Sequence, residues 1–237
     1  MYLLIILLCL LFIAACWTGY QRLLQLKHLN RQRVLYGFLA AMLILTVLTA
    51  AHRFGFFPQY IAARVTMGLY SVIAGFFFGF ASKQYHSRKK AGQMAYAHRS
   101  FWTETAPALI CILLISFGIY RTQLFSFGPF TGIGITSGLS LIAFGIVGLT
   151  IRVVPEFRRK GILVLDRLVP WKKVAAYRWK SEEALQIDYL NTDGQLTDFV
   201  TAIPADDHLV IERLLSKKLA EYEEERKQEI DEINPSV

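Results

Sequence analysis

Long apolar runs alternate with short basic segments over the first two thirds of the chain. A helix needs about 20 largely apolar residues to cross the hydrocarbon core of a bilayer, and its backbone polar groups must be satisfied within the segment. Five runs predict transmembrane helices, at residues 2–20, 34–51, 61–81, 105–120 and 130–151. The run at 105–120 is the shortest, so a four-span alternative in which it is re-entrant stays open.

The pattern changes after Pro155. Short runs rich in β-branched and aromatic residues predict strands within 158–165, 169–179, 184–191 and 195–203. Asp193-Gly194 predicts a hairpin turn, and Pro204 ends the sheet. Asp206 or Asp207 is then expected to cap a final helix, whose apolar stripe comprises Val210, Ile211, Leu214, Leu215, Leu219 and Tyr222.

The two patterns together predict the fold class. We expect a membrane protein with an all-α bundle of five transmembrane helices at 1–154, followed by a small cytoplasmic α+β domain at 155–237. That domain should combine antiparallel strands with a C-terminal helix, and it should end in a charged extension from Glu221 onward.

Charge divides the chain at the same place. Residues 1–151 hold 12 basic residues and one acidic residue, whereas residues 152–237 hold 14 basic and 17 acidic residues. The basic residues gather in the first and third connections and after the fifth run, which predicts an outer N-terminus and a cytoplasmic C-terminus. Because these residues sit between apolar runs, they indicate membrane insertion, and nucleic acid is excluded as a partner.

Small residues recur on one face of two predicted spans. Such faces allow transmembrane helices to approach closely. We expect helix packing through these residues, between the third and fifth spans of one chain, with homodimerisation as the alternative. The positions are Gly68, Ser71, Gly75 and Gly79 in the third span and Gly134, Gly138 and Gly145 in the fifth.

Candidate chemistry is sparse. No Asp, Glu, Lys or Arg falls in the middle third of any predicted span, where transporters keep functional charges. Cys9, Cys16 and Cys111 are interpreted as apolar packing residues, although Ile13 to Cys16 also resembles a lipobox. We predict no catalytic, cofactor or metal site. A membrane enzyme would depend on Glu104 with His86 or His98, on the third connection.

The third connection, residues 82–104, mixes basic and aromatic side chains. It is expected to lie on the inner leaflet as an interfacial helix or to form an ordinary basic loop.

A resemblance appears in the stretch RKGILVLDRLVPWKKVAAYRW. Its features are Lys160-Gly161-Ile162 opening a strand, Pro170-Trp171 at a turn, and then Val174, Tyr177 and Trp179. It resembles the C-terminal domain of uncharacterised bacterial multi-span membrane proteins, a domain similar to pleckstrin-homology-like modules. The resemblance implies the bacterial cytoplasmic (inner) membrane and carries no known activity. A full barrel of that kind has seven strands before its helix, and at most five are expected here.

These observations favour a non-enzymatic integral membrane protein. It would be a scaffold, assembly factor or complex subunit whose cytoplasmic domain binds protein or lipid; a transporter or channel component with a regulatory domain is the alternative. The expected partners are the lipid bilayer and other membrane-protein subunits. Arg158, Arg159 and Lys160 are expected to face lipid headgroups or a partner, with the acids from Glu221 onward facing away.

Overall fold

The computed structural model describes residues 2–21, 58–98, 100–125, 129–165, 167–191 and 194–224, together with scattered residues between 35 and 55. The chain divides into two compact units, and each is assembled from separate segments. A helical unit contains 1–85 and 105–151, and a strand unit contains 86–104 and 152–237. The predicted boundary at 154/155 is therefore close to the last crossing between the units, but the prediction missed that 86–104 belongs to the second unit.

Apolar helices form the first unit. They are α1 (Tyr2–Gln21), α3 (Gln59–Ala91, whose last six residues lie in the strand unit), α4 (Ala106–Thr122) and α5 (Gly132–Thr150). A π-helical turn, Phe101–Thr105, precedes α4. Four helices in the described part of the chain are long and apolar enough to cross a membrane. They coincide with the first, third, fourth and fifth predicted spans, whereas most of the second, 34–51, lies outside the described residues.

Contacts between the helices define their directions. Leu11 and Cys16 of α1 lie against Gly68 and Gly79 of α3, in that order, so α1 and α3 are parallel. Met67 and Phe77 of α3 meet Gly132 and Phe144 of α5 in the same way, so α3 and α5 are parallel as well.

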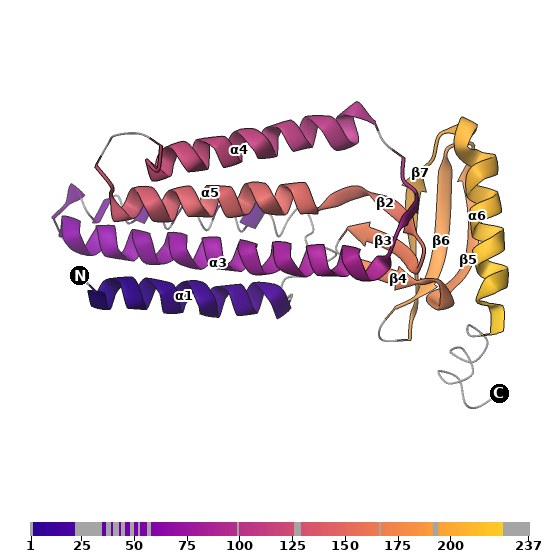
Figure 1. The fold of residues 1–237 in the computed structure, drawn as a ribbon, viewed down its shortest axis with the longest axis horizontal. Helices are drawn as coiled ribbons and strands as arrows, with labels where there is room; N and C mark the ends of the chain where they lie inside the picture. Colours follow the sequence, from indigo (N-terminus) through magenta and orange to yellow (C-terminus); the bar gives the residue numbers. More distant parts are fainter. Residues whose placement is uncertain are drawn as a thin grey trace. The chain divides into compact units, whose positions relative to one another are not determined.

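Helix α4 runs the other way. Its Cys111 lies against Gly145 of α5, while Gly118 lies against Gly138. Among the described helices, α1, α3 and α5 therefore share one direction and α4 opposes them (Figure 1).

Antiparallel strands and one long helix form the second unit. One sheet has the order β1-β2-β3-β4 and the other has the order β5-β6-β7. The bounds are β1 Met94–Tyr96, β2 Arg152–Arg158, β3 Gly161–Leu165, β4 Arg167–Pro170, β5 Val174–Ser181, β6 Ala184–Leu190 and β7 Leu196–Ala202. Short 3-10 turns at Trp171–Lys173 and Ala205–Asp207 precede β5 and α6 (His208–Glu221) respectively. The predicted α+β region with antiparallel strands and a C-terminal helix is confirmed.

The predicted limit of five strands is wrong. Six strands lie between residues 152 and 202 in the described part of the chain, and β1 from the third connection adds a seventh. Strand β2 begins at Arg152, directly after the end of α5, and most of it lies between the predicted fifth span, which ends at 151, and the first predicted strand run at 158–165. The predicted hairpin is present, with Gly194 at φ +73° between β6 and β7.

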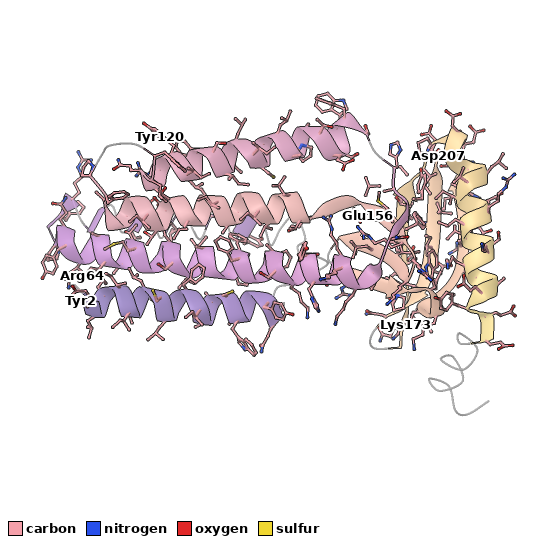
Figure 2. All side chains as sticks on the ribbon, in the orientation of Figure 1. Tyr2, Arg64, Tyr120, Glu156, Lys173 and Asp207 are labelled. Atoms are coloured by element: carbon pink, nitrogen blue, oxygen red, sulfur yellow. The ribbon has the colours of Figure 1, made fainter. Side chains whose placement is uncertain are left out.

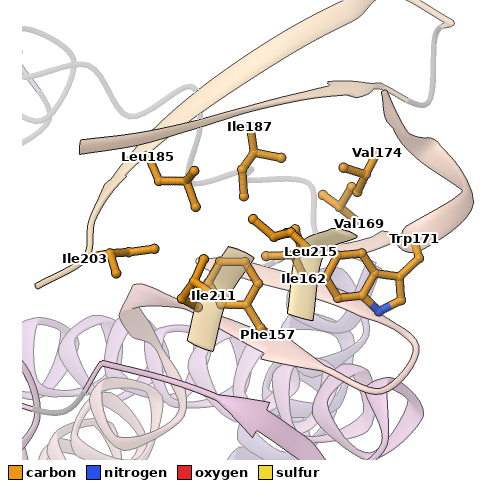
Figure 3. Close-up of a cluster of buried hydrophobic side chains, with 10 residues drawn as sticks. All are labelled: Phe157, Ile162, Val169, Trp171, Val174, Leu185, Ile187, Ile203, Ile211 and Leu215. Atoms are coloured by element: carbon orange, nitrogen blue, oxygen red, sulfur yellow. The ribbon is translucent and has the colours of Figure 1, made fainter. Parts of the chain in front are cut away.

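Apolar side chains from both sheets and α6 fill one core. Trp171, Ile162 and Phe157 from the first sheet and the turn after it are 1% exposed or less, as are Leu185 and Ile187 from β6. Figure 3 shows these side chains pointing toward one another, with Ile211 and Leu215 of α6 among them. Trp171 lies in this core, and so do Ile211 and Leu215 of the predicted α6 stripe, whereas Val210 is exposed.

Candidate functional site

A cluster of exposed basic side chains forms where the β2–β3 turn meets the end of α3. The backbone N–H of Arg159 donates to the Gln93 carbonyl at 2.9 Å, and that of Lys160 donates to the Ala91 carbonyl at 3.2 Å. Lys89 and Lys90 are exposed on the last turn of α3, and Arg159 and Lys160 are exposed in the turn. We call Lys89, Lys90, Arg159 and Lys160 the basic edge. Two distant segments thus bring four positive charges together.

Arg158 does not join this edge. Its Nε and Nη2 donate to Glu156 Oε2 at 2.8 and 2.7 Å, and its Nη1 donates to the Gly92 carbonyl at 2.8 Å. Its side chain is only 15% exposed. The three residues predicted to face lipid therefore separate into two exposed ones, Arg159 and Lys160, and one that holds the strand unit together.

A second arginine lies on the other side of the same carboxylate. Arg88 Nη2 is 3.6 Å from Glu156 Oε1, and the Glu156 side chain is 8% exposed. We call Arg88, Glu156 and Arg158 the Arg–Glu cluster. The indole N–H of Trp171 donates to the Arg158 carbonyl at 2.9 Å and so connects the cluster to the core. Figure 2 shows Glu156 on β2. One carboxylate thus faces two cations, and its loss would weaken the pairing of the largely buried Arg158 side chain.

A small polar cavity of about 160 Å³ adjoins the Arg–Glu cluster. Glu104, His98 and Thr103 line it together with the three members of the cluster. Of the acid and histidine pairs considered for an enzyme, Glu104 and His98 thus share a cavity, whereas His86 does not line it. In the described part of the chain, no group of three His, Cys, Asp or Glu side chains is placed to hold a metal ion. Side chains of both charge signs line the space, so it suits water or a small dipolar molecule.

Tyr96 fastens the third connection to the start of α6. Its hydroxyl donates to Asp207 Oδ2 at 2.6 Å, and its ring lies 6.0 Å from that of Phe157 between centroids. Burial, and then the hydrogen bond to Asp207 and its charge, raise the pKa of Tyr96 above its ordinary value. Asp207, at the N-terminal end of α6 (Figure 2), was expected to cap that helix but makes no side-chain capping hydrogen bond there.

The acidic end of α6 does not lie far from the basic edge. The hydrogen bond from Lys218 lowers the pKa of Glu221, and the charges of Lys218, Lys217 and Arg159 act in the same direction. Arg159 therefore lies within electrostatic reach of Glu221. The expected orientation, with the basic residues after the fifth span toward lipid and the acids from Glu221 onward facing away, stays a prediction.

The predicted third connection begins as the last turns of α3, which ends at Ala91. Its Met94 and Tyr96 pair with Arg158 and Phe157 of β2, and Ala97, His98, Thr103 and Glu104 line the polar cavity. Sequence reasoning missed this strand because three residues carry too little periodicity to identify a strand.

The small residues of α3 pack against α1. A Cβ at Gly79 would lie 1.9 Å from the Cys16 carbonyl oxygen, and a Cβ at Gly75 would lie 2.2 Å from that of Phe12. Ser71 is buried. Gly68 has more space around it, because a Cβ there would lie 3.8 Å from Leu11 Cδ1. Gly19 of α1, which the sequence prediction missed, completes this face, since its Cβ would meet the Phe76 carbonyl oxygen at 2.0 Å.

The small residues of α5 pack against α4. A Cβ at Gly138 would lie 2.6 Å from the Gly118 carbonyl oxygen, and one at Gly134 would lie 3.1 Å from that of Arg121. The expected pairing of the two small-residue faces with each other is therefore wrong. Helices α3 and α5 meet through larger side chains instead, as Phe77 and Phe144 do with ring centroids 5.2 Å apart.

One family model matches part of the chain. A model described as "Domain of unknown function (DUF5673)" matches residues 154–220. These residues contain most of β2 and all of β3 to β7, and nearly all of α6. No curated protein and no solved structure matches the chain.

Proposed function

We propose that this chain is a non-enzymatic protein of the bacterial cytoplasmic membrane that acts as a scaffold, assembly factor or complex subunit. Its strand unit would contact anionic lipid headgroups through the basic edge and leave its other faces for protein partners. The observation that carries the proposal is the assembly of Lys89–Lys90 and Arg159–Lys160 into one exposed cluster by two backbone hydrogen bonds. Lys89 and Lys90 also end the apolar helix α3, which favours a position near the membrane surface.

Five membrane crossings belong to this proposal. Helices α1 and α3 are parallel, so the chain between residues 21 and 59 has to return to the end of the bundle where it started. An 18-residue helix at 34–51 would cover about 27 Å, close to the thickness of a hydrocarbon core. With the basic ends inside, the N-terminus lies outside and the C-terminus is cytoplasmic. A reporter active only outside the cytoplasm should stay silent when fused after Val237.

A pleckstrin-homology-like fold of the strand unit is also proposed. Support comes from the strand count in the described residues, four in one sheet and three in the other, followed by α6 across the core. The seventh strand comes from Met94–Tyr96, so the fold would depend on a segment that precedes α4.

The alternative, a transporter or channel component, has weaker support. A groove of about 740 Å³ opens within the helical unit, between α1, α3 and α5. Its lining is apolar, with Leu11, Phe76, Phe80 and Phe144 among the residues, and Thr18 supplies a lone hydroxyl. Such a lining suits acyl chains or another helix rather than an ion or a polar solute.

Lipid titration of the full chain tests the proposed role of the basic edge. The detergent-solubilised protein is titrated with phosphatidylglycerol or phosphatidylcholine, and native mass spectrometry counts the lipid bound. Since each basic residue near an anionic surface contributes about 1 kcal/mol, replacing both Lys90 and Lys160 with Gln should weaken phosphatidylglycerol binding by about 30-fold. Phosphatidylcholine binding should not change.

A matched control removes two exposed cations from α6, Arg213 and Lys217, in the same way. This variant should lose much less affinity. Equal losses in the two variants would show that net charge, and not the basic edge, governs lipid binding. The proposed lipid contact would then be wrong.

A further inference from the structure

The polar cavity beside the Arg–Glu cluster is built from three segments that are distant in the sequence. All of its lining residues belong to the strand unit. The end of α3 supplies Arg88, β2 supplies Glu156 and Arg158, and the π-helical turn before α4 supplies Thr103 and Glu104. The volume of about 160 Å³ corresponds to about five water molecules. The cavity therefore has room for a short ligand.

The charges that line the cavity are balanced. Arg88 and Arg158 contribute two positive charges, and Glu104 and Glu156 contribute two negative charges. A simple anion would be attracted by the arginines and repelled by both carboxylates, and a simple cation would meet the reverse pattern. A molecule that carries both charges on a short linker can place each one beside the opposite sign. The lining therefore favours a zwitterion.

The two acids of the lining differ in what they face. Glu156 is 8% exposed and already faces both arginines of the cluster. Glu104 comes from the π-helical turn and is partly exposed, so an ammonium group that enters the cavity can reach it. A primary ammonium donates up to three hydrogen bonds, whereas a trimethylammonium group has no N–H to donate. The anionic end of the ligand then lies toward Arg88 and the partly exposed imidazole of His98.

Residues next to the cavity have the composition of a membrane–water interface. Phe101 and Trp102, which precede Thr103 in the π-helical turn, are 56% and 78% exposed, and their ring centroids lie 5.4 Å apart. Exposed tryptophan favours the depth of lipid headgroups. On α3, the exposed Lys89 and Lys90 directly follow Arg88. A zwitterion at this level of a bilayer is a lipid headgroup, in which the anionic group is a phosphate.

We propose that the cavity binds a phosphoethanolamine group, with the ammonium on Glu104 and the phosphate toward Arg88 and His98. The exposed aromatic pair favours the headgroup of phosphatidylethanolamine as its source over a soluble ester. The inference rests on the proposed function for the position of the strand unit at the membrane surface. It concerns a lipid without net charge and residues outside the basic edge, so the two proposals can be tested separately.

A headgroup comparison on the full chain tests the site. The detergent-solubilised protein is titrated with phosphatidylethanolamine, phosphatidylcholine or glycerophosphoethanolamine, and native mass spectrometry counts the molecules bound. The wild type should prefer phosphatidylethanolamine to phosphatidylcholine. Glu104→Gln keeps the shape of the side chain and removes its charge, so it should weaken phosphatidylethanolamine binding about tenfold and leave phosphatidylglycerol binding unchanged. Ala97→Leu fills the cavity without a change of charge and should weaken phosphatidylethanolamine binding as well.

Glu182→Gln is the matched control, because it removes an exposed acid from the β5–β6 turn of the same unit. It should leave phosphatidylethanolamine binding unchanged. Equal affinity of the wild type for phosphatidylethanolamine and phosphatidylcholine, equal effects of Glu104→Gln and Glu182→Gln, or full binding by Ala97→Leu would each overturn the proposal.

Two further outcomes are informative. Tight binding of glycerophosphoethanolamine would support the site and assign its ligand to a soluble source. If Glu104→Gln weakened phosphatidylglycerol binding to the same extent, Glu104 would have a structural role and the proposal would be wrong. Replacing Lys90 and Lys160 with Gln should weaken phosphatidylglycerol binding and leave phosphatidylethanolamine binding unchanged, so failure of the basic edge as a lipid contact would be seen separately.

Discussion

The helical unit and the strand unit are held together by different kinds of contact. In the helical unit the closest approaches bring a glycine against a carbonyl oxygen of the next helix, as Gly79 does against Cys16. In the strand unit the distant segments are joined by charged and hydroxyl groups, with Glu156 and Tyr96 as the central members. In the helical unit, close backbone packing therefore determines how the helices fit together. In the strand unit, ion pairs and hydrogen bonds determine how distant segments join.

Single substitutions can separate the two kinds of contact. A substitution that removes a polar partner should loosen the strand unit alone, and one that adds a methyl group at a helix contact should loosen the helical unit alone. Hydrogen exchange measured segment by segment on the intact protein in detergent separates the two responses.

Glu156→Gln should have the largest effect. The amide keeps the shape of the side chain but removes the negative charge that faces Arg158 and Arg88, and breaking a buried pair in this way costs about 3–4 kcal/mol. Exchange should rise across β1, β2 and β3, while α4 and α5 should exchange as in the wild type.

Glu221→Gln is the matched control. It removes the ion pair with Lys218, in which the glutamate side chain is 49% exposed, and exposed pairs contribute little to stability. If Glu156→Gln had no more effect than this control, polar pairing would not hold the strand unit together.

Gly79→Ala should rank second and should act on the helical unit. The new Cβ would lie 1.9 Å from the Cys16 carbonyl oxygen, and α1 and α3 would have to separate to accept it. Overpacking of this kind costs about 2–3 kcal/mol. The temperature at which the protein unfolds in detergent should fall, with faster exchange along α1.

The control is Gly68→Ala in the same helix, where the nearest atom would lie 3.8 Å from the new Cβ. It should be close to neutral. Similar melting of the two variants would remove the claim that close backbone approach stabilises this unit.

Sequence patterns predicted the helices well because a long apolar helix is encoded by one continuous segment. Its length and apolar composition are read from one continuous run, and α1, α4 and α5 begin and end within a few residues of the predicted bounds. Which helix packs against which is not encoded within one segment. Gly79 and Gly138 were recognised as contact residues, but no feature of either run indicates which helix carries the opposing Cys16 or Gly118.

The basic edge could likewise be predicted only as far as one segment of the chain determines it. Arg159 and Lys160 were identified from their own segment, whereas Lys89 and Lys90 joined them only through the hydrogen bonds of the β2–β3 turn. Arg158 looked equivalent to its neighbours. Because it lies on the strand and not in the turn, its side chain points to Glu156 and the interior.

The hydroxyl of Tyr96 allows the smallest and most specific test of the strand unit. Tyr96→Phe keeps the ring against Phe157 and removes the hydrogen bond to Asp207, and hydrogen bonds to charged groups contribute about 1–2 kcal/mol. Tyr177→Phe is the control, because the Tyr177 hydroxyl makes no hydrogen bond in the described part of the chain.

The effect of Tyr96→Phe should also depend on pH. Burial and the hydrogen bond to Asp207 raise the pKa of Tyr96 in the folded protein above its ordinary value near 10, so the folded state binds this proton more tightly than the unfolded chain does. The resulting stability is fully present below about pH 10 and is lost as pH rises toward the raised pKa. Denaturant unfolding at pH 8 and pH 11 should show a gap between wild type and variant that narrows at the higher pH. A gap that widens there, or one that Tyr177→Phe reproduces, would contradict the role assigned to this hydroxyl.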